Sequence, residues 1–150
     1  MATTQTLWVS GSNVQPAQRG YFMSEVRDGF GSAFYTYGTQ WFFFPIPTPL
    51  VGGKAASLVK VFLLYKTVGT TVIKAIHLDD GRKKLKLDVL TTAVYGAHDV
   101  KPDSMNSWTV GPFQMAFGLN MGAYVDFGPP TKQGTPGIEL VAAGAEFQTP

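Results

Sequence analysis

The clearest pattern along the chain is a strict alternation of residue types between Phe113 and Phe127. Every odd position in this stretch is apolar, and the even positions include polar residues and glycines. A period of two residues is that of a β-strand, because successive side chains of a strand point to opposite faces. We therefore predict a long strand with one face in the core, bent or divided at Gly118 and Gly122.

The most apolar stretch is the segment 41–44, which reads Trp-Phe-Phe-Phe and is followed by prolines at positions 45, 47 and 49. Aromatic side chains favour a pleated strand, and each proline removes a donor from the hydrogen-bond ladder. We predict a strand that stops at Pro45 and leaves the sheet as a stiff, extended segment. Because both faces of this strand are apolar, we expect the core to cover one face and a loop or a second chain to cover the other. A polyproline recognition ligand is the alternative, but such ligands usually lie in disordered tails.

Two further apolar runs, 58–68 and 70–79, predict a hairpin that turns near Gly69. In the register centred on that turn, His77 shares a face with Ile73. A slip of one residue would exchange the two faces of the partner strand, so this register is an expectation that the structure must decide.

Asp80-Gly81 is a strong signal for a second hairpin, which leads into a half-buried strand at 84–89. A closing strand is expected at 137–147. Together these segments make about eight or nine strands, without a convincing amphipathic helix. We predict one domain, residues 1–150, with an all-β fold: a jelly-roll-like antiparallel β-sandwich.

The composition agrees with an all-β domain rich in turns, since the chain contains 17 glycines and 10 prolines. Charged residues make up only 15% of the chain, below the usual level of about a quarter. Either part of the surface is buried in an oligomer, or the fold tolerates a surface with few charged residues. A net charge of +2 is too small to hold nucleic acid, so we expect no nucleic-acid partner.

The chain contains no cysteine, which excludes disulfides and thiolate metal sites. Its first residues show no cationic region followed by an apolar run, so no signal peptide is visible. No run approaches the length of a transmembrane helix. We expect a cytoplasmic protein without a membrane span, and export by a specialised route stays open.

His77 is the titratable residue of most interest, because Asp79 and Asp80 follow it closely. It could act as a general base or a metal ligand, but a partly buried histidine hydrogen-bonded near a turn is the favoured interpretation. His98 and Asp99 are adjacent and would point to opposite faces of a strand. Neither histidine lies in a recognisable ligand motif, and hydrolase and phosphate-loop signatures are absent. We therefore expect no metal and no cofactor, and the sequence does not favour an enzyme.

Aromatic side chains on the surface of a β-sandwich can stack on sugar rings, although tryptophan and tyrosine are also common in cores and interfaces. The candidate ligand-binding residues, taken with the histidine above, are Trp8, Tyr37, Trp41, His77, Trp108 and Tyr124.

Several short motifs resemble a family of small, uncharacterised bacterial domains of unknown function. The resemblance implies a shared β-sandwich fold but no activity, cofactor or site residue. The motifs that carry it are Gly29-Phe30-Gly31, Trp41-Phe42 with the prolines 45–49, Val61-Phe62 with Tyr65, His77 with Asp80-Gly81, Gly118-Leu119, and residues 143–147.

These observations lead to three hypotheses about function. The first is a non-enzymatic binding or assembly module that self-associates through apolar strand faces into a homo-oligomer. The second is the binding of a carbohydrate or a small apolar ligand through surface aromatics. The third is a cofactor-free enzyme with a pocket near His77.

Overall fold

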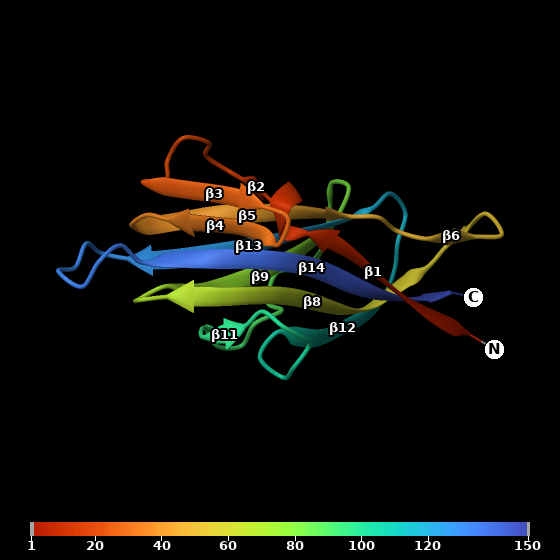
Figure 1. The fold of residues 1–150 in the computed structure, drawn as a ribbon. Coiled ribbons are helices and arrows are strands. Elements are labelled where there is room, and N and C mark those ends of the chain that lie inside the picture. Colours follow the sequence, from red (N-terminus) through yellow and green to blue (C-terminus); the bar gives the residue numbers. More distant parts are fainter. Residues whose placement is uncertain (1, 150) are drawn as a thin grey trace.

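In the computed structural model, which describes residues 2–149, two antiparallel sheets lie face to face (Figure 1). The two terminal residues of the predicted domain lie outside the described residues. Sheet A contains β1 (Thr3–Ser10), β3 (Ser24–Asp28), β4 (Gly31–Tyr35), β8 (Ser57–Val68), β11 (Ala97–His98), β12 (Ser107–Gln114) and β14 (Gly137–Thr149). Sheet B contains β2 (Gln15–Pro16), β5 (Gly38–Ile46), β9 (Val72–Asp80), β10 (Lys83–Lys86) and β13 (Leu119–Gly128).

Two small elements complete the fold: the 3-10 turn η1 (Gly11–Asn13), and a hairpin of β6 (Leu50–Val51) and β7 (Lys54–Ala55). This hairpin and both chain ends lie at the same end of the molecule (Figure 1). Among the residues that the structure describes, no helix is long and apolar enough to cross a membrane.

The order of strands in sheet B is β10-β9-β13-β5-β2, which places β13 in the middle between β9 and β5. In sheet A the central strands β8 and β14 pair with each other, and β1 and β4 share the other edge of β14. Consecutive long strands alternate between the sheets, since β4, β8, β12 and β14 belong to sheet A and β5, β9 and β13 belong to sheet B. The antiparallel β-sandwich is therefore confirmed, and its crossing connections are those of a jelly-roll-like fold.

The predicted hairpin of residues 58–79 is wrong. Strand β8 lies in sheet A and β9 lies in sheet B, so the turn at Gly69 carries the chain from one sheet to the other. Both strands send apolar side chains into the same core, and a sequence pattern cannot distinguish strands that face each other from strands that pair. The predicted sharing of a face by His77 and Ile73 is also wrong, because an irregularity in the pairing of β9 with β13 lies between them. Ile73 is buried and His77 points outward.

The predicted alternation is confirmed in β13, where the odd positions from Leu119 to Phe127 are all buried. The predicted long strand is divided at the segment 115–118, so that its first part belongs to β12 in sheet A. The hairpin at Asp80-Gly81 is confirmed by the pairing of β10 with β9.

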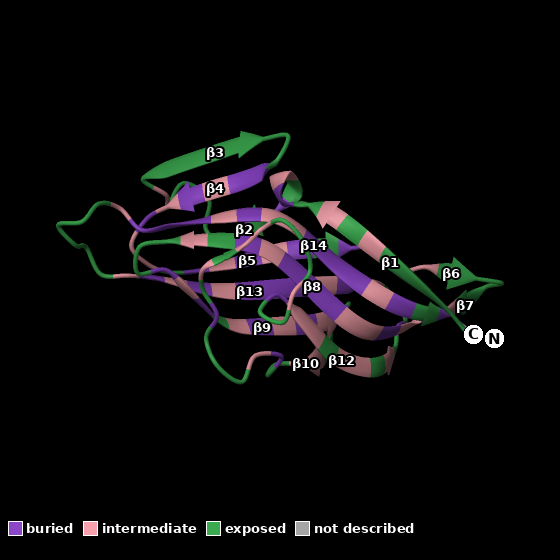
Figure 2. Cartoon of the chain, turned by 60° about the horizontal axis from the view of Figure 1, so that its bottom comes forward, coloured by how far each residue is buried: buried purple, intermediate pink, exposed green. Residues whose placement is uncertain are grey.

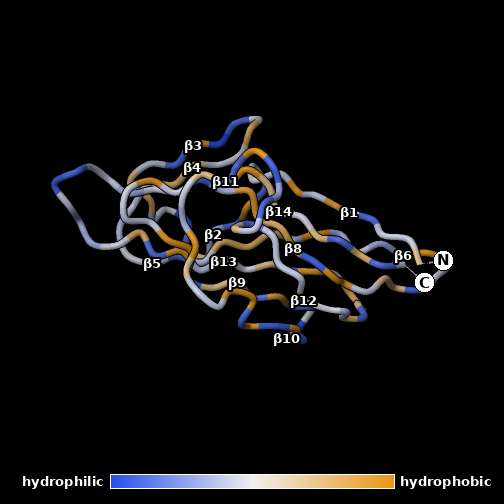
Figure 3. Tube along the Cα trace, turned by 90° about the horizontal axis from the view of Figure 1, so that it is seen from below, coloured by the Kyte–Doolittle hydropathy of each residue, from blue (hydrophilic) through white to orange (hydrophobic). Residues whose placement is uncertain are grey.

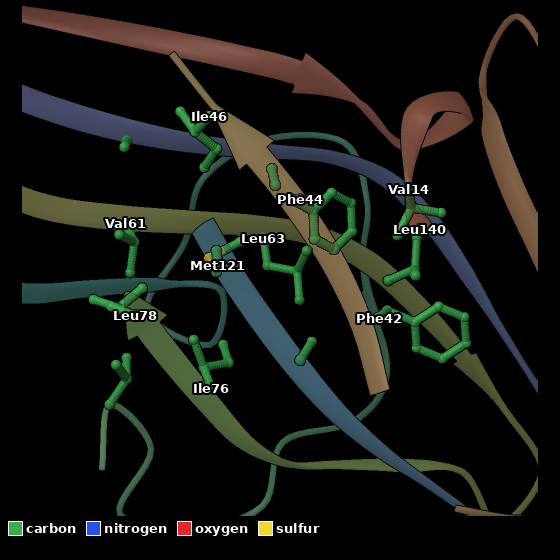
Figure 4. Packing of buried hydrophobic residues seen from close by; sticks show 14 of the residues in the cluster. Val14, Phe42, Phe44, Ile46, Val61, Leu63, Ile76, Leu78, Met121 and Leu140 are labelled. Carbon is green, nitrogen blue, oxygen red and sulfur yellow. The ribbon is translucent and has the colours of Figure 1, made fainter. Parts of the chain in front are cut away.

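Side chains from both sheets fill the space between them (Figure 4). From sheet B, Phe42 and Phe44 lie in the core, and from sheet A, Leu63 and Leu140 meet them; all four are fully buried. Because Phe42 and Phe44 point inward, their neighbours on the same strand must point to the outer face of sheet B.

The edges of the two sheets are polar or exposed. Strand β3 is exposed along its whole length (Figure 2), and it carries the ion pair of Arg27 with Glu25. Strand β10 is mostly hydrophilic (Figure 3) and contains three lysines. Charged edge strands discourage pairing with other chains, so these edges disfavour association through added strands.

Candidate aromatic binding face

A cluster of aromatic rings lies on the outer face of sheet B, and we call it the aromatic face. Trp41 and Phe43 come from β5, Tyr124 comes from β13 and His77 comes from β9. All four side chains are half-buried, whereas the residues between them on each strand point into the core. The alternation of the strands therefore brings these four rings together on the side of the sheet that faces away from sheet A.

The rings are in contact with one another. The centroids of Trp41 and Phe43 are 6.2 Å apart and their planes differ by only 4°. Trp41 also lies 4.9 Å from Tyr124, its direct partner on β13. The centroids of Trp41 and His77 are 4.6 Å apart. Strands β5 and β9 lie on opposite sides of β13, at about 10 Å from each other, so the two rings must lean toward each other across the middle strand.

Gly122 on β13 makes this arrangement possible. It pairs with Phe43 on one side and with His77 on the other. A Cβ atom at this position would lie 3.2 Å from Cε1 of Phe43, which is tighter than ordinary van der Waals contact, and 3.4 Å from Cε3 of Trp41, which is in contact. The absence of a side chain leaves room for both rings to approach the strand. The rings of Trp41 and Phe43 are nearly parallel, whereas His77 and Tyr124 are tilted against Trp41 by 52° and 36°.

Polar side chains border the aromatic face. On one side, Lys74 forms an ion pair with Asp126, and the hydrogen bond from Lys74 holds the pKa of Asp126 below its ordinary value. On the other side, Asn120 lies opposite Asp79 in the strand register, and Asp79 in turn lies opposite Lys84 on β10. The border therefore carries two acidic and two basic side chains, and Asn120 between them is uncharged.

A further polar residue, Gln15, borders the aromatic face at β2. It pairs with Phe43, and its side-chain oxygen accepts a hydrogen bond of 2.7 Å from the guanidinium group of Arg19.

A groove of about 490 Å³ lies where the aromatic face reaches the end of sheet B. Pro45 and Asn120 belong to both the outer face and this groove, and Pro47, Gly81 and Phe117 complete its walls. The side chain of Phe117 is 85% exposed, and its ring lies beside Gly81 in the turn between β9 and β10.

Asp80 fixes the turn that carries Phe117. Its carboxylate is buried and accepts hydrogen bonds from the backbone N–H groups of Ala116, Phe117 and Gly118, at 2.6, 2.8 and 2.9 Å. Burial by itself raises the pKa of Asp80, but these hydrogen bonds and the nearby Lys83 ammonium outweigh burial, so the pKa lies below its ordinary value. Of the two carboxylates considered as partners of His77, Asp79 and Asp80, the second is therefore a structural carboxylate whose side chain is buried on the opposite face of β9.

The structure brings together three of the six predicted ligand-binding residues, namely Trp41, His77 and Tyr124. Phe43 was missed, although it follows Trp41 by two positions on a predicted strand and so had to share its face. Asn120 was missed because only the strand order places it beside the aromatic rings.

The other three predicted residues lie elsewhere. Trp8 lies on the outer face of sheet A, over Gly144 and 5.2 Å from the ring of Phe62. Trp108 packs against the core from β12. Tyr37 lies in the turn between β4 and β5, where its carbonyl oxygen accepts a hydrogen bond from the hydroxyl of Tyr21.

The second histidine, His98, is the last residue of strand β11 in sheet A. Nδ1 of His98 lies 2.7 Å from a carboxylate oxygen of Asp103, so its partner is Asp103 and not the adjacent Asp99. The two histidines lie in different sheets. Among residues 2–149, no group of three or more histidine, cysteine or acidic residues is arranged to hold a metal ion.

No protein-family model matches the chain, and no curated protein matches it. Among solved structures, the chain is similar to the CBM36-1 domain of a multidomain xylanase from the hindgut metagenome of Trinervitermes trinervoides. The two are 11% identical with a TM-score of 0.44, over 95% of this chain and 96% of that chain. An exo-β-1,3-galactanase from Phanerochaete chrysosporium, with galactose, is also 11% identical, with a TM-score of 0.39. The match covers 97% of this chain and 29% of the galactanase.

Similarities of this degree carry no argument about what this chain binds. The resemblance to a family of bacterial domains stays a prediction, because no family model matches. The small β-sandwich that the resemblance implied is confirmed by the strand pairing.

Proposed function

We propose that the aromatic face of sheet B binds neutral carbohydrate by stacking sugar rings on Trp41 and its neighbours. The observation that carries this proposal is the indole of Trp41, which lies across Gly122 and reaches the ring of His77. A sugar ring presents C–H groups on its face, and these are attracted to the electron-rich face of an aromatic ring. The adjoining, nearly parallel rings of Trp41 and Phe43 suit this kind of contact.

The border of the aromatic face supplies the polar groups that a sugar needs. Ligand sites combine apolar surface with a few placed donors and acceptors. The amide of Asn120 both donates and accepts hydrogen bonds, and the carboxylate of Asp79 accepts from hydroxyl groups. Because Lys74 pairs with Asp126 and Lys84 lies opposite Asp79, no excess of charge attracts an ionic ligand to this surface. This balance supports a neutral carbohydrate.

Self-association through the same face is the second candidate, and the half-buried Trp41 and Phe43 favour it. A dimer with this face at its centre would bury the ion pair of Lys74 and Asp126, together with Asp79. Removing charged groups from water opposes association unless each finds a new partner. A sugar offers its own hydroxyl groups to these border charges or leaves them in water, so none is left without a partner, which favours the carbohydrate.

A cofactor-free enzyme with a pocket at His77 has less support. The groove beside the aromatic face is lined by Pro45, Asn120 and Phe117 among others, and His77 is not one of its lining residues. The ring of His77 instead forms part of the aromatic surface.

Affinity gel electrophoresis tests the proposal. The gels contain hydroxyethyl cellulose, xylan, β-1,3-glucan or galactan, with polygalacturonate as the anionic comparison. We expect at least one neutral polysaccharide to retard the protein, and Trp41→Ala to weaken that retardation about tenfold. The matched control is Trp8→Ala, which removes an exposed tryptophan that also lies over a glycine, but on sheet A.

The proposal fails if none of these polysaccharides retards the protein, or if Trp8→Ala and Trp41→Ala behave alike. Sedimentation velocity at micromolar concentration is the companion measurement. A dimer that Trp41→Ala converts to a monomer would support self-association in place of carbohydrate binding.

A further inference from the structure

We propose that the carbohydrate site continues from the aromatic face into the groove at Phe117, and that its ligand is an extended, ribbon-like chain of β-1,4-linked sugars. This inference rests on the proposed function, and it names the class and length of ligand that the same site takes. Two observations carry it: the unbroken course of the outer surface along β5 and β13, and the fixed position of an exposed aromatic ring at the far end.

The outward positions of β5 run in one line from the aromatic face to the groove. Trp41 and Phe43 are followed by Pro45 on the same face, and Pro47 then forms part of the groove wall. Pro47 lies six positions beyond Trp41, which corresponds to about 20 Å of extended chain. A single sugar would occupy only a small part of this distance, whereas a chain of several sugars would follow it.

The neighbouring strand supplies a parallel line of outward positions. On β13, Tyr124 and Gly122 are followed by Asn120, which pairs with Pro45 and lines the groove. Phe117 stands just before the start of this strand. The surface therefore carries flat rings at both ends and, between them, an uncharged amide that can bind hydroxyl groups.

Phe117 is held in place although its ring is exposed. The three hydrogen bonds from residues 116–118 to Asp80 fix the backbone on both sides of the ring. The backbone that carries Phe117 is therefore ordered before any ligand arrives, and binding to an ordered group loses less conformational freedom. An aromatic ring that lines a groove from an ordered backbone is thus suited to serve as a second stacking position.

The spacing of these groups selects the shape of the ligand. A β-1,4-linked chain is a straight ribbon whose sugar faces can rest on flat rings while its edges carry hydroxyl groups. Such a ribbon can reach Trp41 and Phe117 at once and pass over Asn120. A strongly curved or helical chain would reach one end of the surface and leave the other.

Isothermal titration with cello-oligosaccharides and xylo-oligosaccharides of one to six units tests the inference. For at least one series, we expect affinity to rise with length until the chain spans both ends. Phe117→Ala should lower affinity for the hexasaccharide about fivefold and leave the disaccharide nearly unchanged. Phe30→Ala is the matched control, because Phe30 is 82% exposed in the turn between β3 and β4 of sheet A.

The outcomes separate the two proposals. If the disaccharide binds as tightly as the hexasaccharide, or if Phe117→Ala has no more effect than Phe30→Ala, the extended site is wrong and stacking on Trp41 stands. If no oligosaccharide binds while a polysaccharide with another linkage retards the protein, the β-1,4-linked ligand is wrong. If neither oligosaccharides nor polysaccharides bind, both proposals fail. Circular dichroism of Phe117→Ala confirms that the fold is retained.

Discussion

The rings of Trp41 and His77 lie 4.6 Å apart although their strands, β5 and β9, do not pair with each other. They meet above β13 near Gly122, which pairs with His77 on β9 and with Phe43 on β5. The aromatic face therefore depends on three strands at once. Gly122, which has no side chain, leaves the room in which the rings of Phe43 and Trp41 approach the strand.

A side chain at position 122 should lift the rings. In Gly122→Val, the added carbons would collide with Phe43 and Trp41, whose atoms already lie 3.2 and 3.4 Å from the place of a Cβ. We expect carbohydrate affinity to fall about tenfold, with a stability loss of about 1–3 kcal/mol from the overpacked surface. Near-ultraviolet circular dichroism would report the altered contact of Trp41 with Tyr124.

Gly29→Val is the control for this variant, since nothing lies within 4 Å of a Cβ at Gly29. Unchanged affinity and an unchanged near-ultraviolet spectrum in Gly122→Val would contradict the role given to Gly122.

Neutralising Asp80 should weaken the fold at neutral pH. In the wild type, both carboxylate oxygens of Asp80 accept hydrogen bonds from backbone N–H groups. In Asp80→Asn, an amide NH2 group replaces one of these oxygens and faces a donor, so we expect a loss of about 3 kcal/mol in the free energy of unfolding at pH 7. Urea denaturation followed by tryptophan fluorescence measures this loss. Asp88→Asn is the control, because the Asp88 carboxylate is exposed and pairs with Lys86 at the surface. Equal midpoints for the two variants would argue against an anchoring role.

The carboxylate of Asp80 also makes the free energy of unfolding depend on pH. The folded-state pKa of Asp80 lies below the ordinary value of 3.8, so the unfolded chain takes up the proton first. The stabilisation is present above pH 3.8 and is lost as the pH falls through the folded-state pKa. Between pH 5 and pH 2, the wild-type chain should therefore lose more stability than Asp80→Asn. Parallel decreases in the two proteins would contradict this assignment.

Asn106 should be indispensable to the loop that joins β11 to β12. Its buried side chain donates hydrogen bonds to the carbonyl oxygens of His98 and Lys101, and it accepts from the backbone of Asp103. Asn106→Ala leaves these groups unpaired, and we expect a loss of about 3 kcal/mol. A thermal melt measures it, with the exposed Asn13→Ala as the control. Similar melting temperatures for the two variants would show that the network contributes little.

The fold class followed from local patterns, whereas the partners of each strand did not. The burial of alternate residues from Leu119 to Phe127 repeats what the sequence predicts. The prediction that β8 pairs with β9 was wrong, because a turn such as that at Gly69 can either join two paired strands or carry the chain from one sheet to the other. Alternation fixes which way a side chain points, but it carries no information about which strand lies beside it.

The aromatic face was predictable only in part, because strand order is not readable from the sequence. Trp41, Tyr124 and His77 stood out as aromatic or titratable residues, but their meeting depends on the order β9-β13-β5. Asn120 and Gly122 have no unusual feature in the sequence, and only their place beside Trp41 and Phe43 gives them a role.

The repeated crossing of the chain between sheets also bears on how the molecule forms. Each strand of the aromatic face is separated from the next by a strand of the opposite sheet, so no local fragment can assemble the face early. Such distant pairings slow the search for the native state. Quenching of the fluorescence of Trp41 by its neighbours should consequently appear only in the last kinetic phase of refolding, when β5, β9 and β13 have paired.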